Sequence, residues 1–397
     1  MSSARIDILS LDDKALAAFV ATLGERSFRA HQIFAWLHQR GATSFEAMTD
    51  LSRALRQKLA DAAVINSPRV DVVRVAADGT RKYRLLTHDG HAIESVFIPS
   101  ASGPGKNALC ISSQVGCAMG CTFCATASMK LLRNLTAGEI AAQLYVVARD
   151  LEGAALVHDD GERFDDESDE SDEGDNDVND VNDVNDVAAA AKRRVQNIVF
   201  MGMGEPLHNV DAVIASIGLL TSARGQGMSP RRLTVSTSGM VPAIARLGKE
   251  TSVHLAVSLN ATTDDVRADI MPVDKRWNIE ALLDATRAFP RNKSRRRVTF
   301  EYVLLAGVND SDDDAKRLIA LVRDQEAKVN LIPYNPHPLS PFTRPSDARV
   351  RSFQALIERA RVPVFVRTTR GLDIDAACGM LGAQKLEEAR RGLPVVP

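Results

Sequence analysis

The sequence predicts an α/β protein whose main part is a partial (β/α)6 barrel, with a small N-terminal helical domain and a β-meander extension. The first observation is that strands and amphipathic helices alternate between residues 108 and 366. Several of these strands are continuously apolar, as is typical of parallel strands covered on both faces. The second observation is that the hydrophobic period changes near residue 70 from that of helices to that of strands. Six strand–helix units are fewer than the eight of a closed barrel, so we expect a partial one.

The first 65 residues are predicted to form a helical module. Asp12 resembles an N-cap before the first helix, a second helix is expected over residues 27–40, and a third from about Ser44. Cations on this module suit contact with an RNA backbone, although a module that only packs against the barrel could carry them too. They are Arg26, Arg29, His31, Arg40, Arg53, Arg56 and Lys58.

Residues 66–107 are predicted to form a three-stranded meander. Its two turns are Asp-Gly pairs, at Asp78 and Asp89, and this pair is the strongest short signal for a hairpin. Glu94 lies in the third strand and by alternation shares a face with Val96 and Ile98. A carboxylate on an apolar face is unusual unless the protein uses it.

The barrel is predicted over residues 108–375, and residues 376–397 form a C-terminal segment. We expect strands over 108–111, 197–201, 233–237, 253–259, 298–305, 328–332 and 364–366. We expect helices over 136–149, 211–223, 241–247, 279–289, 313–323 and 347–361.

An acidic insertion interrupts the barrel at residues 152–191. It contains sixteen Asp and Glu residues and one Arg, a local charge of −15, whereas the whole chain carries −2. The rest of the chain therefore carries +13, which suits a polyanionic partner such as nucleic acid, although an ordinary solvated surface could carry the same charge. The insertion is too polar to form a core, so we expect it to be disordered.

Composition excludes some classes of protein. The chain has a mass of 43.1 kDa and is 45% hydrophobic, and no apolar run reaches the roughly 18 residues of a membrane span. The N-terminus lacks the apolar core of a secretory signal. We therefore expect a cytoplasmic protein without a membrane partner.

Four of the five cysteines lie between residues 108 and 126. Cys117, Cys121 and Cys124 have the spacing C-x3-C-x2-C beside Gly116 and Gly120, whereas Cys110 precedes them. Three thiolates on a loop relaxed by glycines can ligate three corners of an iron–sulfur cluster and leave the fourth iron open. A structural zinc is the alternative, and it would need a fourth ligand, for which His88 and His91 are the candidates. The odd cysteine count argues against structural disulfides.

Small polar residues follow four predicted strands. Each alone could be a helix cap or a turn, but the carboxyl ends of parallel strands meet at one edge, where such residues would surround a polar ligand. The strand ends contain the polar residues Glu205, Ser236, Ser258, Asn260 and Asn335, together with Gly204 and with Leu259 of the segment Ser258-Leu259-Asn260. The fifth cysteine, Cys378, lies among small residues and forms a natural reactive pair with Cys110.

These motifs together resemble the radical SAM superfamily, and within it the RlmN family of 23S rRNA and tRNA adenine-C2 methyltransferases. The resemblance rests on Glu94, Cys110, the segment Ser-Ser-Gln-Val-Gly-Cys117, Gly-Met-Gly-Glu205-Pro, Ser236-Thr-Ser-Gly and Asp-Ile-Asp-Ala-Ala-Cys378-Gly. It covers nearly the whole chain outside residues 152–191. Asn260 departs from the pattern, because relatives often carry His at this position.

The resemblance implies a mechanism and its residues. Cys117, Cys121 and Cys124 would hold a [4Fe–4S] cluster that binds S-adenosylmethionine (SAM), and the strand-end residues named above would bind the same SAM. One SAM would methylate Cys378, and a second would give a 5′-deoxyadenosyl radical that activates this methyl group for attack on adenine C2. Glu94 would then remove the C2 proton, and Cys110 would attack the sulfur of Cys378, leaving a disulfide.

The expected substrates are adenine 2503 of 23S rRNA and adenine 37 of tRNAs, and the expected partners are these RNAs and an electron-donating, flavodoxin-like reductase. We expect the enzyme to be a monomer. Two alternatives remain open at this point. One is methylation at C8 of the same rRNA adenine, and the other is an RNA-binding protein stabilised by a metal and without catalysis.

Overall fold

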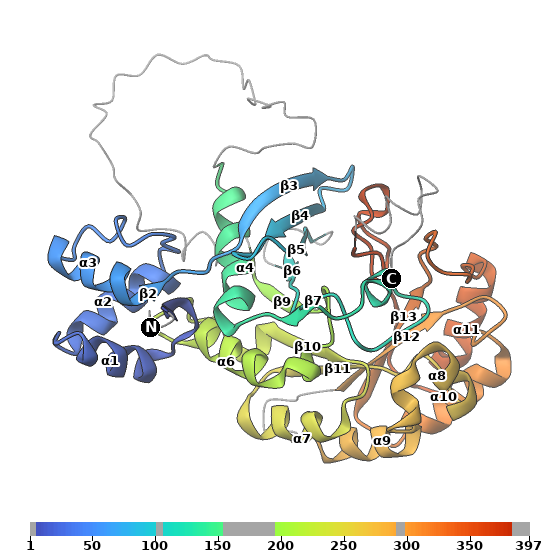
Figure 1. Cartoon of the computed structure of the whole chain (residues 1–397). Coiled ribbons are helices and arrows are strands. Elements are labelled where there is room, and N and C mark those ends of the chain that lie inside the picture. Colours follow the sequence, from blue (N-terminus) through green and yellow to red (C-terminus); the bar gives the residue numbers. More distant parts are fainter. Residues whose placement is uncertain (1–4, 101–105, 154–194, 291–297, 383–397) are drawn as a thin grey trace, which may run out of the picture.

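The computed structural model describes residues 5–100, 106–153, 195–290 and 298–382 (Figure 1). A single ten-stranded sheet organises the fold, in the order β14-β13-β12-β11-β10-β9-β6-β5-β4-β3. Its parallel part contains β6 (Ala108–Cys110), β9 (Asn197–Phe200), β10 (Leu233–Thr237), β11 (His254–Ser258), β12 (Val298–Leu304), β13 (Ala327–Pro333) and β14 (Val364–Val366).

Each parallel strand except the last is followed by a helix, which confirms the predicted partial barrel. The helices are α4 (Ala137–Asp150), α6 (Val210–Thr221), α7 (Val241–Glu250), α9 (Ile279–Ala288), α10 (Asp312–Val322) and α11 (Asp347–Arg359). A further short helix, α8 (Asp264–Ile270), lies between β11 and α9 and was not predicted. The barrel stays open because β6 pairs on its outer side with an antiparallel strand, β5, and not with another parallel one.

Side-chain caps fix where several helices begin. Thr136 Oγ1 accepts from the N–H of Glu139, and the Glu139 carboxylate accepts from the N–H of Thr136, so α4 starts with a capping box. Ser311 and Asp314 form the same arrangement at α10. These reciprocal bonds satisfy backbone donors that no helical carbonyl can reach, which is why the start of α4 was predictable from the sequence.

The meander continues the barrel sheet. Its strands β3 (Arg69–Val75), β4 (Arg81–Leu86) and β5 (Ala92–Ile98) are antiparallel, and β5 pairs with β6. Gly79 and Gly90 have φ values of +77° and +83°, which the turns between these strands require and glycine adopts freely. The predicted strands and both Asp-Gly turns are therefore confirmed.

The N-terminal module has three helices, α1 (Asp13–Thr22), α2 (Phe28–His38) and α3 (Arg53–Ala62). The prediction of a helix from about Ser44 was wrong, because the chain forms turns up to Ser52. Ser52 Oγ accepts from the N–H of Leu55 at 3.2 Å and so caps α3 at Arg53. A short parallel pair, β1 (Ile6–Asp7) with β2 (Ala63–Val64), joins the two ends of the module and was not predicted.

The module packs directly on the barrel. Gly138, in the first turn of α4, donates its N–H to Ser10 Oγ at 3.0 Å. A Cβ atom at this glycine would lie 2.8 Å from the carbonyl carbon of Leu9, so the close approach needs glycine. Residues 154–191 of the predicted acidic insertion and residues 383–397 lie outside the described residues. Among the described residues, no helix combines the length and apolarity needed to cross a membrane.

Candidate active site

The three spaced cysteines lie on a loop that leaves the sheet after β6. This loop begins with β7 (Gln114–Val115), which pairs with β8 (Arg133–Asn134), so its two ends are held together. Gly116 has φ +77°, and a Cβ there would lie 1.7 Å from the carbonyl oxygen of Lys130. Only glycine permits this approach, which directs Cys117 and the residues after it toward the barrel.

The chemistry of the three thiols fits an iron–sulfur cluster. Burial raises the pKa of Cys117 to about 12 and also raises the pKa values of Cys121 and Cys124; for Cys121, repulsion from the other two is the next cause. Three thiolates here therefore need positive charge to balance them, as the irons of a cluster provide. A single zinc ion is the alternative to a cluster, and the ligands of one tetrahedral zinc ion lie about 3.8 Å apart.

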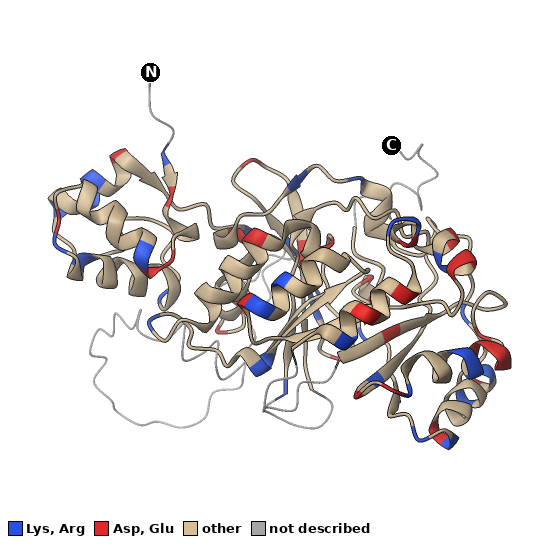
Figure 2. Cartoon of the chain, turned by 90° about the horizontal axis from the view of Figure 1, so that it is seen from below, with Lys and Arg blue, Asp and Glu red and all other residues tan. Residues whose placement is uncertain are grey.

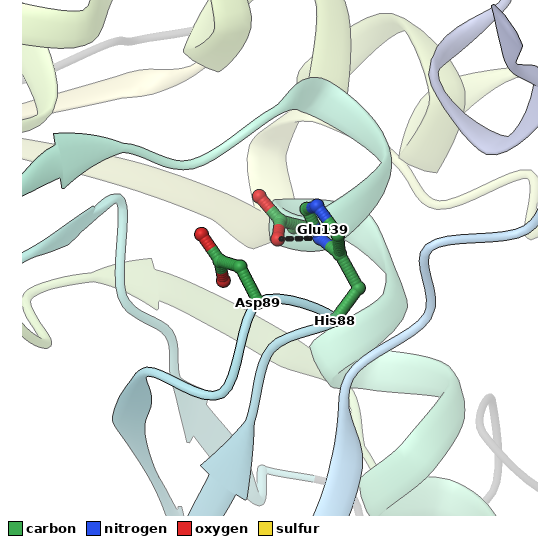
Figure 3. A group of neighbouring side chains, drawn as sticks. All are labelled: His88, Asp89 and Glu139. Atoms are coloured by element: carbon green, nitrogen blue, oxygen red, sulfur yellow. Dashed lines mark ion pairs between the residues drawn. The ribbon is translucent and has the colours of Figure 1, made fainter. Parts of the chain in front are cut away.

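The sulfur atoms of Cys117, Cys121 and Cys124 do not lie close enough together to hold a single zinc ion. Among the described residues, the only three-residue group of potential ligands whose atoms all lie within 4.8 Å of one another is His88, Asp89 and Glu139 (Figure 3). This group lies at the β4–β5 turn and the start of α4, and Arg133 occupies its carboxylates, at 2.8 Å from Glu139 and 2.7 Å from Asp89. It is an ion-pair network, and His88 is not the fourth ligand that the zinc alternative requires.

The segment after β9 packs against the start of the cysteine loop. The N–H of Met203 donates to Ser112 Oγ at 2.8 Å, and the N–H of Glu205 donates to Gln114 Oε1 at 2.8 Å. Gly204 has φ +99°, and a Cβ there would lie 2.5 Å from the side chain of Gln114. Gly204 is thus explained by its left-handed φ and by close packing against the Gln114 side chain.

Glu205 is buried and holds two strand ends together. One oxygen accepts from the N–H of Leu207 at 2.9 Å and the other from the N–H of Ser238 at 2.7 Å, which links the ends of β9 and β10. Burial raises the pKa of this carboxyl group, while the backbone donors act in the opposite direction. Its remaining acceptor capacity faces the pocket described below.

Asn260 adopts a backbone conformation that explains its residue type. Its φ is +56°, in the left-handed region where Asn and His are both enriched among non-glycine residues. Its side-chain oxygen accepts from the N–H of Val303 at 2.8 Å, so it links the ends of β11 and β12. The departure from the family's His therefore keeps a residue suited to this conformation.

These elements surround a pocket at the carboxyl ends of the parallel strands. Its empty space, including the part open to solvent, is about 1010 Å³. The predicted site residues that line it are Cys117, Cys121, Cys124, Gly204, Glu205, Ser236, Ser258, Asn260, Asn335 and Cys378. Leu259 does not line it, because its side chain is fully buried in the core.

The segment that carries Cys378 closes this pocket. The carbonyl of Cys378 accepts from Asn335 Nδ2 at 3.2 Å, and the carbonyl of Gly379 accepts from the N–H of Ala125 at 2.8 Å. Cys378 is exposed, whereas Cys110 on β6 is buried. Burial raises the pKa of Cys110 to about 12, with the charge of the nearby Cys378 as the next cause. The two cysteines expected to react with each other are thus neighbours although 268 positions separate them.

Glu94 contacts the segment that carries Cys378, at a position that follows this cysteine in the chain. It is 3% exposed, and its Oε2 accepts from the N–H of Gly382 at 2.7 Å. The side chain that was unusual on sequence grounds therefore contacts the C-terminal segment.

Sequence reasoning missed two buried side chains that shape the site. Arg267, on α8, is fully buried and donates to the carbonyls of Ser238 at 2.6 Å and Ser258 at 3.1 Å, and to Asp274 Oδ1 at 2.7 Å. Gln143, on α4, accepts from the N–H of Ser112 and donates to its carbonyl, both at 2.8 Å. Neither lies in a recognisable motif, and α8 was not recognised although Thr263 precedes Asp264 and Asp265 at its start.

Comparison with known proteins gives matches over nearly the whole chain. Residues 6–65 match the family described as Ribosomal RNA large subunit methyltransferase N-terminal domain, and residues 111–319 match the Radical SAM superfamily. The chain is 46% identical to Dual-specificity RNA methyltransferase RlmN 2 of Myxococcus xanthus, over 95% of this chain and 90% of the relative. It is 43% identical to the RlmN of Novosphingobium aromaticivorans, over 98% and 89%. The crystal structure of a radical SAM methyltransferase from Sphaerobacter thermophilus superimposes with a TM-score of 0.80 at 39% identity, over 94% of this chain and 98% of that one.

Proposed function

The chain belongs to the RlmN family of radical SAM methyltransferases, and we propose that it methylates C2 of adenine 2503 in 23S rRNA and of adenine 37 in tRNAs. The observation that carries the proposal is that Cys378 lines one pocket with the three spaced cysteines, while Cys110 lies within reach of the charge of Cys378 and Glu94 contacts the same C-terminal segment at Gly382. Radical SAM enzymes use SAM and a [4Fe–4S] cluster.

Cys117, Cys121 and Cys124 would hold the cluster, and Glu205, Ser236, Ser258, Asn260 and Asn335 would bind SAM beside it. When bound, these cofactors supply a 5′-deoxyadenosyl radical, which is needed because adenine C2 is too weak a nucleophile for polar methylation. Side chains of the protein itself would carry the methyl group, accept the proton and form the disulfide. Part of the pocket wall is apolar, with Met271, Phe123 and Val303 among its lining residues.

Cys378 would carry the methyl group that becomes bonded to adenine C2. Glu94 would accept the C2 proton, and its contact with Gly382 keeps it on the segment that bears Cys378. Cys110 would then lose its thiol proton and attack the sulfur of Cys378, so that the new disulfide forms as the bond from sulfur to the methyl-derived carbon breaks; that carbon keeps the electron pair and takes up a proton to become the methyl group. An electron-donating reductase would restore both thiols.

The N-terminal module supports an RNA substrate. Figure 2 shows basic segments on its helices. Arg26 and Arg53 are exposed, and Phe28 is 46% exposed with the Arg29 guanidinium 4.8 Å from its ring centroid, an arrangement that suits stacking on an unpaired base. Other predicted RNA contacts have partners within the module, since Arg40 lies over Trp36 and Lys58 pairs with Glu25. We propose that a monomer binds RNA through this face, in the cytoplasm.

Nucleoside analysis tests the proposal against methylation at C8. Protein reconstituted anaerobically with iron and sulfide is given SAM, a reductant and an rRNA fragment or a tRNA, and the digested RNA is examined by mass spectrometry. We expect 2-methyladenine. If 8-methyladenine were the sole product, the proposed position of methylation would be wrong.

Two variants test the residue roles. Cys378→Ala should abolish methylation while RNA binding stays unchanged, and unchanged methylation would contradict a methyl-carrying cysteine. A metal-stabilised binding protein without catalysis would show no turnover even in the wild type. Glu94→Ala should accumulate a covalent protein–RNA adduct, and free release of methylated RNA by that variant would refute its role as proton acceptor.

A further inference from the structure

A buried lysine of the meander lies beside Glu94. Lys82, on β4, is 3% exposed, and its Nζ lies 3.5 Å from Glu94 Oε1, which belongs to a side chain that is itself 3% exposed. Removing an ammonium group from water is costly unless an opposite charge stands close to it. Packing alone would favour an apolar residue here, so the lysine calls for a further explanation.

The same ammonium group also contacts the segment that carries Cys378. Lys82 Nζ donates to the carbonyl oxygen of Asp375 at 3.2 Å. Asp375 has φ +55° and ends the short helix η7 (Leu372–Ile374), three positions before Cys378. The Lys82 ammonium group therefore links the Glu94 carboxylate, on β5, to the backbone of Asp375, which lies 293 positions after Lys82.

Glu94 completes this arrangement beyond Cys378. Its second oxygen accepts from the N–H of Gly382 at 2.7 Å. The Lys82–Glu94 pair thus contacts the segment on both sides of the cysteine, at Asp375 and at Gly382. The backbone carbonyls of Cys378 and Gly379 are held by Asn335, just after β13, and by Ala125 of the cysteine loop, and not by the meander.

We propose that Lys82 is a positioning residue that fixes Glu94 and both ends of the Cys378 segment relative to one another. The inference rests on the proposed function, in which Glu94 accepts the proton and Cys378 carries the methyl group. Both groups must meet the same adenine, and a displacement of either by about 1 Å is enough to slow catalysis strongly. The buried ion pair holds them to one geometry through contacts at Asp375 and Gly382.

Hydrogen–deuterium exchange tests the attachment without depending on the proposed reaction. Cluster-containing protein is compared with Lys82→Met, and with Lys82→Gln in case the first variant folds poorly. We expect the peptide spanning residues 375–382 to exchange about tenfold faster, which corresponds to about 1.4 kcal/mol. Lys316→Met is the matched control, because Lys316 pairs with Asp313 on the exposed surface of α10. Unchanged exchange in this peptide, or equal acceleration throughout β9–β11, would overturn the proposal.

Kinetics separate positioning from simple structural support. In Lys82→Met we expect kcat to fall about 10–100-fold while KM for RNA changes by less than about threefold. Covalent protein–RNA adduct should accumulate although Cys378 is methylated normally, and Lys82→Arg should recover much of the rate. A parallel fall in iron content, Cys378 methylation and adduct would show a structural role only. If the wild type made no methylated adenine, the proposed function would fail while the exchange experiment still decided the attachment.

Discussion

Substitution of Gly116 by Ala should prevent the cysteine loop from closing, whereas the same substitution at Gly120 should be mild. Both glycines have positive φ, +77° and +70°, so each variant bears a backbone cost of about 1–2 kcal/mol. At Gly116 the new Cβ would also lie 1.7 Å from the carbonyl oxygen of Lys130, whereas at Gly120 its nearest neighbour is Pro272 Cγ at 3.7 Å.

The clash at Gly116 can be relieved only by moving backbone. The N–H of Cys117 donates to the carbonyl of Lys130 at 3.2 Å, and the N–H of Leu132 donates to the carbonyl of Val115 at 2.9 Å. Losing both bonds adds about 1 kcal/mol each, so Gly116→Ala should cost about 3–4 kcal/mol in all. The difference from Gly120→Ala is then about 2 kcal/mol.

Two measurements check this prediction. Iron and sulfide per chain are determined after anaerobic reconstitution, and the free energy of unfolding is measured by denaturant titration of the same samples. Gly116→Ala should hold less than half the iron of the wild type, whereas Gly120→Ala should stay close to it. Equal iron content and equal stability of the two variants would refute the reasoning that a backbone contact makes glycine obligatory at residue 116.

Three further predictions concern the rest of the chain. Arg267→Met should lower the free energy of unfolding by about 3 kcal/mol and weaken SAM binding in equilibrium titrations, because Asp274 stays buried without its partner and the carbonyls of Ser238 and Ser258 lose their donor; SAM affinity equal to that of the wild type would contradict it. Burial lowers the pKa of His38 from 6.5 to about 3. Between these two pH values the unfolded chain therefore binds a proton on His38 and the folded chain does not. The stability that the neutral ring contributes is fully present above pH 6.5 and falls by up to about 1.4 kcal/mol per pH unit as the pH drops toward 3, and a His38→Gln variant should lose this slope in urea titrations. Deletion of residues 155–188 should leave folding and methylation intact, and loss of either would show that the acidic insertion has a role.

The fold could be predicted where local chemistry and the global fold agree. The Asp-Gly turns, the Thr136 capping box and the apolar parallel strands each specify their element through short-range interactions. The start of α3 could not be placed, because Met48 and Leu51 keep a helical spacing while they are buried by turns of the chain. Tertiary burial overrode the periodicity there.

The site residues that belong to sequence motifs could be predicted, whereas the buried side chains that hold them in position could not. Cys117, Glu205 and Cys378 belong to segments whose residue types indicate a functional site, and the structure places all three around one pocket. Arg267 and Lys82 carry no such signal, because an isolated cation in a sequence is usually a solvated surface residue. Their burial depends on partners brought together by the complete fold.

The meander therefore contributes more than an extension of the sheet. Lys82 and Glu94 lie on neighbouring strands, where Lys82 pairs with Val96 and is therefore a diagonal neighbour of Glu94, within reach of a long side chain. Pairing of β5 with β6 then sets this pair at a fixed register from Cys110, which lies opposite Val96. A slip of one residue between β5 and β6 would turn Glu94 to the other face of the sheet, and a slip between β4 and β5 would turn Lys82 away from Glu94. The ladder that joins the meander to the barrel thus fixes where the proposed proton acceptor, Glu94, lies relative to Cys110 and to the segment that carries Cys378.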